Sequence, residues 1–235
     1  MMNPWSGNQI TLNTFKHKGY WYFGKERERR TMERFSQLVR PGDTVLEVGG
    51  HIGFISQYFA KLVGPRGKVI VFEPGLNNLP YILRNTVHLP QVLVECLAVS
   101  NHVGEATFYE DDITGQNNSL MSNYRGADDV AKSHKLDVVK VARTVKLTTL
   151  DAYIEANPLK VDFVKIDIEG YELNALKGAE NLLKRTPALM IEITEHHDEV
   201  VALLRKHGYV MSDDKGNVID VLGPSFAGNV FFFKE

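Results

Sequence analysis

The sequence alternates between short apolar runs rich in β-branched residues and stretches with helical periodicity. This alternation constrains the fold most, because strands joined by helices form a parallel sheet with helices on both faces. We predict strands at 44–48, 68–72, 91–99, 161–166 and 188–193, and helices at 52–62, 77–87, 171–184 and 200–206. The pattern therefore predicts an α/β fold with a mostly parallel sheet.

The end of the chain departs from this alternation. Two strand-like runs, 208–212 and 230–233, are separated by the turn Lys215-Gly216-Asn217 and by no helical stretch. Consecutive strands without a crossover helix pair in antiparallel fashion. We therefore predict a mixed sheet that closes with an antiparallel C-terminal strand.

Two segments lie outside the alternating pattern. Residues 1–40 form an N-terminal extension with a predicted helix over 25–39, and residues 110–143 form a polar, turn-rich insertion into a main domain at 41–235. Open α/β sheets bind ligands at the carboxyl ends of their strands, and we expect both segments to border that edge. We interpret the extension as a helical cap and the insertion as a wall of the substrate site.

Composition narrows the class of protein. The 235 residues include 27 Lys and Arg against 29 Asp and Glu, so the formal net charge is -2 and no basic excess indicates a nucleic-acid partner. Cys96 is the single cysteine, which excludes an intramolecular disulfide. The chain starts without a signal-peptide pattern and has no apolar run of about 20 residues. We expect a cytoplasmic protein without a membrane partner, and the sequence is compatible with a homodimer.

The aromatic residues Trp21, Tyr22 and Phe23 stand out in the extension. They could line a sugar or aromatic acceptor site. We favour core packing or a dimer contact, because large apolar side chains are usually buried.

The first candidate site is the glycine turn between the strand at 44–48 and the following helix. Gly49 can adopt backbone angles closed to other residues, and Gly53 allows the helix to approach the sheet closely. The spacing Gly-x-His-x-Gly lacks the three-glycine pattern that holds a pyrophosphate. A ligand without phosphate groups fits this turn better, although a tight turn without any ligand is the alternative.

The second candidate is Glu73, which ends the next strand 24 residues after Gly49 (73 minus 49). A carboxylate at that place can accept hydrogen bonds from both hydroxyls of a ribose. The alternative is an exposed acid that caps the helix after Pro74. The two motifs together indicate an adenosyl ligand more specifically than either does alone.

The third candidate is the stretch from Phe163 to Glu172. Lys165 and Asp167 interrupt a buried strand and share one face, because side chains alternate along a strand. Asp167 and Glu169 would then lie at the carboxyl end of the strand, beside Gly49. Two carboxylates there could orient an acceptor hydroxyl, remove its proton or bind a divalent cation. A structural Lys165–Asp167 ion pair is the alternative.

The fourth candidate is the run from Glu192 to Asp198 at the end of the next strand. We expect Glu192 to point toward Asp167, and His196 or His197 could act as a general base. Adjacent histidines also occur at solvated helix starts. Asp167, Glu169 and Glu192 together offer oxygen ligands of the kind that Mg²⁺ prefers.

At these residues the chain resembles the FkbM family of S-adenosylmethionine-dependent methyltransferases. The matching stretches are 45–53, 72–74, 150–153, 161–172, 176–179 and 190–193, and Lys-Ile-Asp-Ile-Glu-Gly at 165–170 is the most specific of them. The chain departs from the family where His51 occupies a position that is usually Asn and Gly50 one that is usually Ala. His51 could still donate a hydrogen bond to the carboxylate of the cofactor.

The resemblance implies the Rossmann-like class I methyltransferase fold and O-methylation of a hydroxyl on a small molecule, sugar or glycan. From the motifs and the resemblance we predict cofactor contacts at Glu47, Gly49, His51, Gly53, Glu73, Ser100 and Asp167. For catalysis we predict Asp167, Glu169, Glu192 and His196. The expected cofactor is S-adenosyl-L-methionine, with Mg²⁺ as a further candidate at Asp167, Glu169 and Glu192.

The sequence favours three other functions less. A nicotinamide-dependent oxidoreductase is disfavoured by the glycine spacing and by the missing Tyr-x-x-x-Lys pair. Methylation of base amino groups is disfavoured by the acidic balance and by the missing Asn/Asp-Pro-Pro-Tyr/Phe tetrapeptide. A non-catalytic Rossmann-like binding module would be favoured by loss of the glycine turn or the carboxylates, and both are present.

Overall fold

The computed structural model describes residues 1–122, 139–223 and 226–234. In that part of the chain a seven-stranded sheet has the strand order β3-β2-β1-β7-β8-β10-β9. These strands are β1 (Thr44–Val48), β2 (Lys68–Phe72), β3 (Val92–Glu95), β7 (Phe163–Ile166), β8 (Ala188–Ile193), β9 (Val210–Ser212) and β10 (Gly228–Phe233). The predicted α/β fold is confirmed.

The directions of the strands also agree with the sequence. β1 pairs in parallel with both β2 and β7, and β7 pairs in parallel with β8. The last strand, β10, lies between β8 and β9 and is antiparallel to both. The predicted antiparallel C-terminal strand is therefore present, and it is inserted beside β8.

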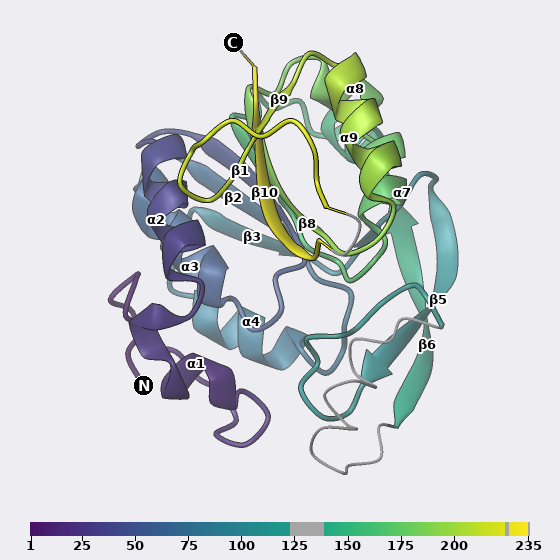
Figure 1. Cartoon of the computed structure of the whole chain (residues 1–235). Helices are drawn as coiled ribbons and strands as arrows, with labels where there is room; N and C mark the ends of the chain where they lie inside the picture. The colour runs from purple at the N-terminus through teal and green to yellow at the C-terminus, as the bar shows by residue number, and fades with distance from the viewer. Residues whose placement is uncertain (123–138, 224–225, 235) are drawn as a thin grey trace.

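Helices cover the two faces of this sheet (Figure 1). One face packs against α2 (Arg29–Leu38), α3 (Phe54–Val63) and α4 (Leu79–Thr86), and the other against α6 (Leu150–Ala156), α7 (Glu172–Lys177), α8 (Glu180–Leu183) and α9 (His197–Lys206). Alternate residues of a strand pack into the hydrophobic cores on opposite faces of the sheet. Phe163 belongs to the core on the first face and Val164 to the core on the other. Both are fully buried, as expected for a sheet covered on both faces.

The N-terminal extension packs on the first face. Trp5 and Ile10 join the core that contains α2 and α3, so the extension is part of the main fold. The predicted helix at 25–39 is divided into a short 3-10 helix (Gly24–Glu26) and α2, and a further helix, α1 (Lys18–Tyr22), precedes the predicted range. Glu28, with φ at 51°, has left-handed backbone angles that interrupt a helix.

A second, three-stranded sheet has the order β4-β6-β5, formed by β4 (Ala98–Val99), β5 (Gly104–Asp111) and β6 (Lys140–Thr148). The predicted single strand at 91–99 is therefore wrong, because its last residues leave β3 and pair in parallel with β6. The ends of the predicted insertion 110–143 lie in β5 and β6, which pair in antiparallel fashion. Its residues 123–138 lie outside the described residues.

The predicted helix at 171–184 is two helices, because α7 ends at Lys177, with Gly178 as its cap, and α8 begins at Glu180. A Cβ atom at Gly178 would lie 2.2 Å from the carbonyl oxygen of Ser100. The chain needs glycine at this close approach, and glycine is a weak helix former. Within the described residues, the structure contains no helix long and apolar enough to cross a membrane.

Candidate active site

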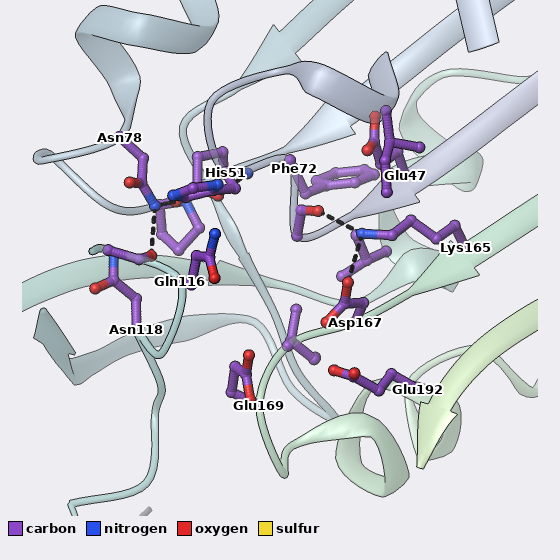
Figure 2. Close-up of a pocket in the computed structure, with 18 of the residues that line it drawn as sticks. Glu47, His51, Phe72, Asn78, Gln116, Asn118, Lys165, Asp167, Glu169 and Glu192 are labelled. Carbon is purple, nitrogen blue, oxygen red and sulfur yellow. Dashed lines mark hydrogen bonds and ion pairs between the residues drawn. The ribbon is translucent and has the colours of Figure 1, made fainter. Parts of the chain in front are cut away.

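A cavity of about 1080 Å³, counted out to the solvent at its mouth, lies at the carboxyl ends of β1, β2, β7 and β8. Ligands of open α/β sheets bind at this edge. Residues from the extension and from the β5–β6 region complete the lining, among them Tyr20, Arg27, Glu28, Gln116 and Asn118. Figure 2 shows the polar residues that face this cavity.

The glycine turn forms one wall. Gly49 has φ at 88°, and a Cβ there would lie 1.9 Å from the carbonyl oxygen of Asp167, so the turn needs glycine for two reasons. Gly49 and Gly50 line the cavity. Gly53 is not among the lining residues: it precedes α3 and packs against Ile82, where an added Cβ would lie 3.0 Å from a side-chain carbon. The close approach at Gly53 is therefore to α4, whereas the sequence predicts an approach to the sheet.

His51 lines the cavity, but both of its ring nitrogens are bonded within the protein. Nε2 lies 3.1 Å from the carbonyl oxygen of Thr114, and Nδ1 lies 2.8 Å from the hydroxyl of Tyr20. A carbonyl can only accept, so Nε2 carries the proton and Nδ1 accepts from Tyr20. Burial lowers the pKa of His51 to about 3, which keeps the ring neutral. The expected side-chain hydrogen bond to a cofactor carboxylate therefore has no free donor here.

Glu73 is buried at the end of β2 and holds the turns around it. Its Oε2 accepts from the backbone N–H of His51 at 2.7 Å, and its Oε1 accepts from Gly75 at 2.9 Å and from Asn78 at 3.3 Å. Burial raises the pKa of Glu73 to about 7. Oε2 has a single protein donor and keeps one lone pair for a ligand hydroxyl.

Glu47 lies on the neighbouring strand β1 and is fully buried. Among the described residues, neither of its carboxylate oxygens accepts a hydrogen bond of normal geometry. Burial raises its pKa to about 7, against the opposing charge of Lys165 and the nearby Ser56 hydroxyl. A buried carboxylate without donors is costly, and a cationic ligand in the cavity would relieve that cost.

Lys165 joins the glycine turn to the acid at the end of β7. It is 2% exposed, and its ammonium group donates to the carbonyl oxygen of Gly49 at 2.8 Å and to Asp167 at 3.0 Å (Figure 2). Burial alone would raise the pKa of Asp167, but the charge of Lys165 holds it below its usual value. The predicted sharing of one face by Lys165 and Asp167 is confirmed.

Three carboxylates meet beside this pair. Oxygen atoms of Asp167, Glu169 and Glu192 lie within 4.8 Å of one another, and Figure 2 shows the three side chains gathered below Lys165. The charge of Asp167, followed by burial, raises the pKa of Glu192, so Glu192 is protonated and hydrogen-bonds to Asp167. The cluster can hold a shared proton or, with that proton displaced, a divalent cation.

Sequence reasoning missed the residue that shapes this cluster. Glu172 is buried and accepts from the backbone N–H groups of Ile168 and Gly170 at 3.1 and 3.0 Å. This closes a tight turn in which Glu169 has φ at 57°. The hydroxyl of Ser119 donates to the Glu169 carbonyl at 2.9 Å. An acid two residues after a glycine in a short turn was the available signal.

The extension contributes the second group that the sequence did not indicate. Arg27 and Glu28 line the cavity, and the Arg27 guanidinium lies 4.3 Å from the centre of the Tyr20 ring. The sequence around Arg27 and Glu28 did not indicate that these residues line a site, because their approach to the cavity depends on how the extension packs.

Besides Gly53, the structure leaves two predicted residues, His196 and Ser100, outside the cavity lining. His196 is 47% exposed and pairs with Glu199 on α9 at 3.3 Å, because the chain turns away from β8 at this point. Ser100 is fully buried, and its hydroxyl bonds to Asn101 at 3.3 Å. Neither lines the cavity, and the roles predicted for them are not retained.

Known proteins match this chain over the region that contains the glycine turn and the carboxylates. The model of the methyltransferase FkbM domain matches residues 47–211. The hexuronic acid methyltransferase AglP of Haloferax volcanii is 24% identical over 153 residues, which cover 64% of this chain and 56% of that protein. The match therefore spans about half the length of the relative.

Two solved structures show the same fold. The methyltransferase FkbM of Methylobacillus flagellatus has 15% identity and a TM-score of 0.52, covering 96% of this chain and 56% of that one. A protein described as a putative rRNA methylase from Clostridium thermocellum has 12% identity and a TM-score of 0.51, covering 88% and 94%. The cavity, the sheet order and the family match together show that the chain has the class I methyltransferase fold and belongs to the FkbM methyltransferase domain family.

Proposed function

We propose that this protein is an S-adenosylmethionine-dependent O-methyltransferase that acts on a hydroxyl group of a small molecule, sugar or glycan. One observation carries the proposal: the glycine turn, Glu73 and the three carboxylates around Asp167 line a single cavity. Each group on its own has a structural explanation, but their convergence in one cavity supports a site for an adenosyl ligand and an acceptor.

The charge of the cavity suits this cofactor. Six carboxyl groups line the cavity, compared with two cationic side chains, Lys165 and Arg27. The carboxyl groups are those of Glu28, Glu47, Glu73, Asp167, Glu169 and Glu192. Glu47 in addition lacks a hydrogen-bond donor. When bound, S-adenosylmethionine supplies a methyl group activated by a positively charged sulfur. An acidic cavity stabilises such a cation through its charge.

Two elements of the cavity would hold the cofactor. The free lone pair of Glu73 Oε2 is available to a ribose hydroxyl, and the Gly49 turn allows the ligand to lie close to the main chain. Glu47 would balance the positive charge. A pyrophosphate is disfavoured, because the turn lacks the three-glycine spacing and the Glu73 carboxylate would repel a phosphate.

Asp167 is our first candidate for the group that removes the proton of the acceptor hydroxyl or weakens its O–H bond. Lys165 holds it ionised, whereas its neighbour Glu192 is protonated, so the pair contains one acceptor and one donor of protons. Carboxyl groups with separated pKa values suit general acid and base roles. Glu169 and Glu192 would orient the acceptor or carry Mg²⁺ in the same cluster.

Among acceptors, sugars that carry a carboxylate come first in our proposal. The relative from Haloferax volcanii is named for a hexuronic acid. In this chain the guanidinium of Arg27, beside the Tyr20 ring, lines the cavity and offers a paired donor for a carboxylate. Neutral sugars, uronic acids and aromatic hydroxyl compounds form the acceptor panel.

The decisive experiment has two parts. Titration calorimetry should detect S-adenosylhomocysteine binding, with NADH as the comparison, and transfer of labelled methyl should then be measured over the acceptor panel. Binding of NADH in place of S-adenosylhomocysteine would identify a nicotinamide protein. Cofactor binding without transfer to any acceptor would favour the non-catalytic module.

A further inference from the structure

Exposed aromatic side chains are confined to one short segment of the described chain. Among the large hydrophobic residues that are exposed there, the aromatic ones are Phe15, Trp21, Tyr22 and Phe23, with exposures of 77%, 44%, 65% and 56%. We call these four residues the aromatic patch. Core packing, one of the two expected roles of Trp21, Tyr22 and Phe23, is therefore wrong, because each residue is exposed; the other expected role, a dimer contact, stays a prediction. Clusters of exposed apolar residues usually mark an interaction surface.

The aromatic patch adjoins the cavity wall. Tyr20, on the same helix α1, points inward, lines the cavity and bonds to His51. The residues that follow it point outward, and Figure 1 shows α1 on the outside of the molecule, near the N-terminus. A surface bound by the aromatic patch would consequently lie close to the cavity.

The segment around the aromatic patch is basic, in contrast to the rest of the chain. Residues 15–30 contain six Lys and Arg and two Glu, a formal charge of +4 (six minus two), whereas the whole chain has -2. The ammonium group of Lys18 lies 5.6 Å from the centre of the Tyr22 ring, and Lys25 is exposed on the following turn. The ammonium group of Lys16, next to Phe15 in the sequence, donates to the carbonyl oxygen of Asp112 at 2.9 Å. Cations and aromatic rings therefore share one surface.

We propose that the aromatic patch and its lysines dock the protein on an anionic lipid surface, with the rings inserted at the level of the headgroups. Trp, Tyr and Phe beside Lys and Arg are the residues that peripheral proteins place at this interface. The lysines complement anionic headgroups. The expectation of no membrane partner rests on the missing signal peptide and the missing apolar run, and neither feature is needed for docking at a lipid surface. This docking is independent of the proposed reaction.

Other occupants fit the aromatic patch less well. The rings of Trp21 and Tyr22 meet at 80° and those of Tyr22 and Phe23 at 88°, so they form no flat platform for a sugar face. A symmetric dimer through this surface would bring its positive charges against the same charges of the copy. A nucleic acid whose nucleotides entered the adjoining cavity would meet the six carboxylates that line it.

Co-sedimentation with vesicles tests this inference on the full chain without cofactor. The protein should bind vesicles of phosphatidylcholine mixed with phosphatidylglycerol and bind pure phosphatidylcholine at least tenfold more weakly. Added salt should release it, because exposed charges are screened. Anionic vesicles should also shift Trp21 fluorescence to the blue, against the constant signal of the buried Trp5.

The combined variant F15S/W21S/Y22S/F23S should lose vesicle binding at least tenfold. A matched control, V87S/V221S, removes two equally exposed apolar side chains elsewhere (82% and 80%) and should bind as the unaltered protein does. K16Q/K18Q/K25Q should lose the preference for anionic vesicles. Unchanged melting temperatures would show that the variants fold.

Four outcomes would overturn the inference. The first is that the protein binds neither vesicle type, and the second is that the four-serine variant binds vesicles as well as the unaltered protein does. The third is that the protein prefers a single-stranded RNA oligonucleotide, which then competes with the vesicles. The fourth is that the protein self-associates and the four serines abolish this self-association. The last two would assign the aromatic patch to nucleic acid and to a second copy, respectively. Because no acceptor or cofactor is used, failure here leaves the proposed reaction unaffected, and the converse also holds.

Discussion

The ammonium group of Lys165 donates a hydrogen bond of 2.8 Å to the carbonyl oxygen of Gly49. This bond connects the turn proposed to hold the cofactor with the strand that carries the proposed base, because the same nitrogen pairs with Asp167. Lys165 is also the register partner of Glu47 across β1 and β7. A buried cation thus faces the acids of two neighbouring strands.

Lys165→Met should destabilise the protein strongly. Removing one member of a buried ion pair leaves the other charge uncompensated, at a cost of about 3–5 kcal/mol in the free energy of unfolding. Urea denaturation followed by circular dichroism measures the difference. Lys160→Met is the matched control: Lys160 pairs with Asp162 on the surface and is 87% exposed, so little change is expected. Equal effects of the two substitutions would contradict the linking role of Lys165.

Asp167→Asn should lower kcat by about 10²–10⁴-fold, the range of a lost general base, once an acceptor is known. S-adenosylhomocysteine affinity should stay within several-fold. His196→Ala is the comparison, because its side chain lies outside the cavity and should leave kcat unaltered. Methyl transfer and calorimetry provide both readouts, and full turnover by the Asn variant would remove Asp167 from the reaction.

Glu73→Gln should weaken S-adenosylhomocysteine binding by about tenfold to a hundredfold, which corresponds to one hydrogen bond to a charged group. Glutamine keeps the volume of the side chain in a site where three protein donors meet it. Glu95→Gln is the control, since Glu95 ends the next strand but bonds to Tyr153 outside the cavity lining. Equal affinities of both variants in calorimetry would argue against ribose recognition by Glu73.

Affinity for S-adenosylmethionine should rise with pH through Glu47. Burial raises the pKa of Glu47 to about 7, so the carboxyl group is mostly neutral at pH 6 and ionised at pH 8. A cation prefers the ionised form, which predicts a gain of up to about tenfold over this interval. The same shift means that ligand-free protein loses stability as pH rises from 4.5, the usual pKa, through 7.

Calorimetry at pH 6, 7 and 8 on the protein and on Glu47→Gln isolates this contribution, because ionisation of the ligand is common to both. The difference between them should grow with pH. A constant difference would show that Glu47 does not sense the bound cation.

Chelation tests the proposed magnesium. Once the Glu192 proton is displaced, Asp167, Glu169 and Glu192 carry three formal charges; Lys165 balances one, and a divalent cation would neutralise the remaining two. EDTA treatment should therefore lower methyl transfer, and Mg²⁺ should restore it. Full activity in EDTA would favour the alternative in which Glu192 and Asp167 share a proton.

Much of the architecture could be predicted because it depends on residues close together in the sequence. Alternating periods of two and 3.6 residues indicated the main strands and most helices, and a strand pair without a crossover indicated the reversed β10. The same local rule placed Lys165 and Asp167 on one face of β7. Glu73 could be located because it ends the strand that follows the glycine turn.

Contacts between distant segments could not be derived in this way. The division of 91–99 between two sheets follows from the pairing of Ala98 with Leu147, far along the chain. The engagement of both His51 ring nitrogens could not be predicted, because Tyr20 and Thr114 reach the ring from segments 31 and 63 residues away. Their positions depend on packing, which local periodicity does not encode.

The sequence by itself determined which strands and helices form and which polar residues interrupt them, because backbone geometry and side-chain alternation act over a few residues. The tertiary structure alone decided that His196 turns away, that Arg27 and Tyr20 line the cavity, and that Trp21, Tyr22 and Phe23 face solvent. Those outcomes depend on strand register and on the burial of apolar surface by segments remote in sequence, where the free energy of the whole fold, and no local preference, selects the arrangement.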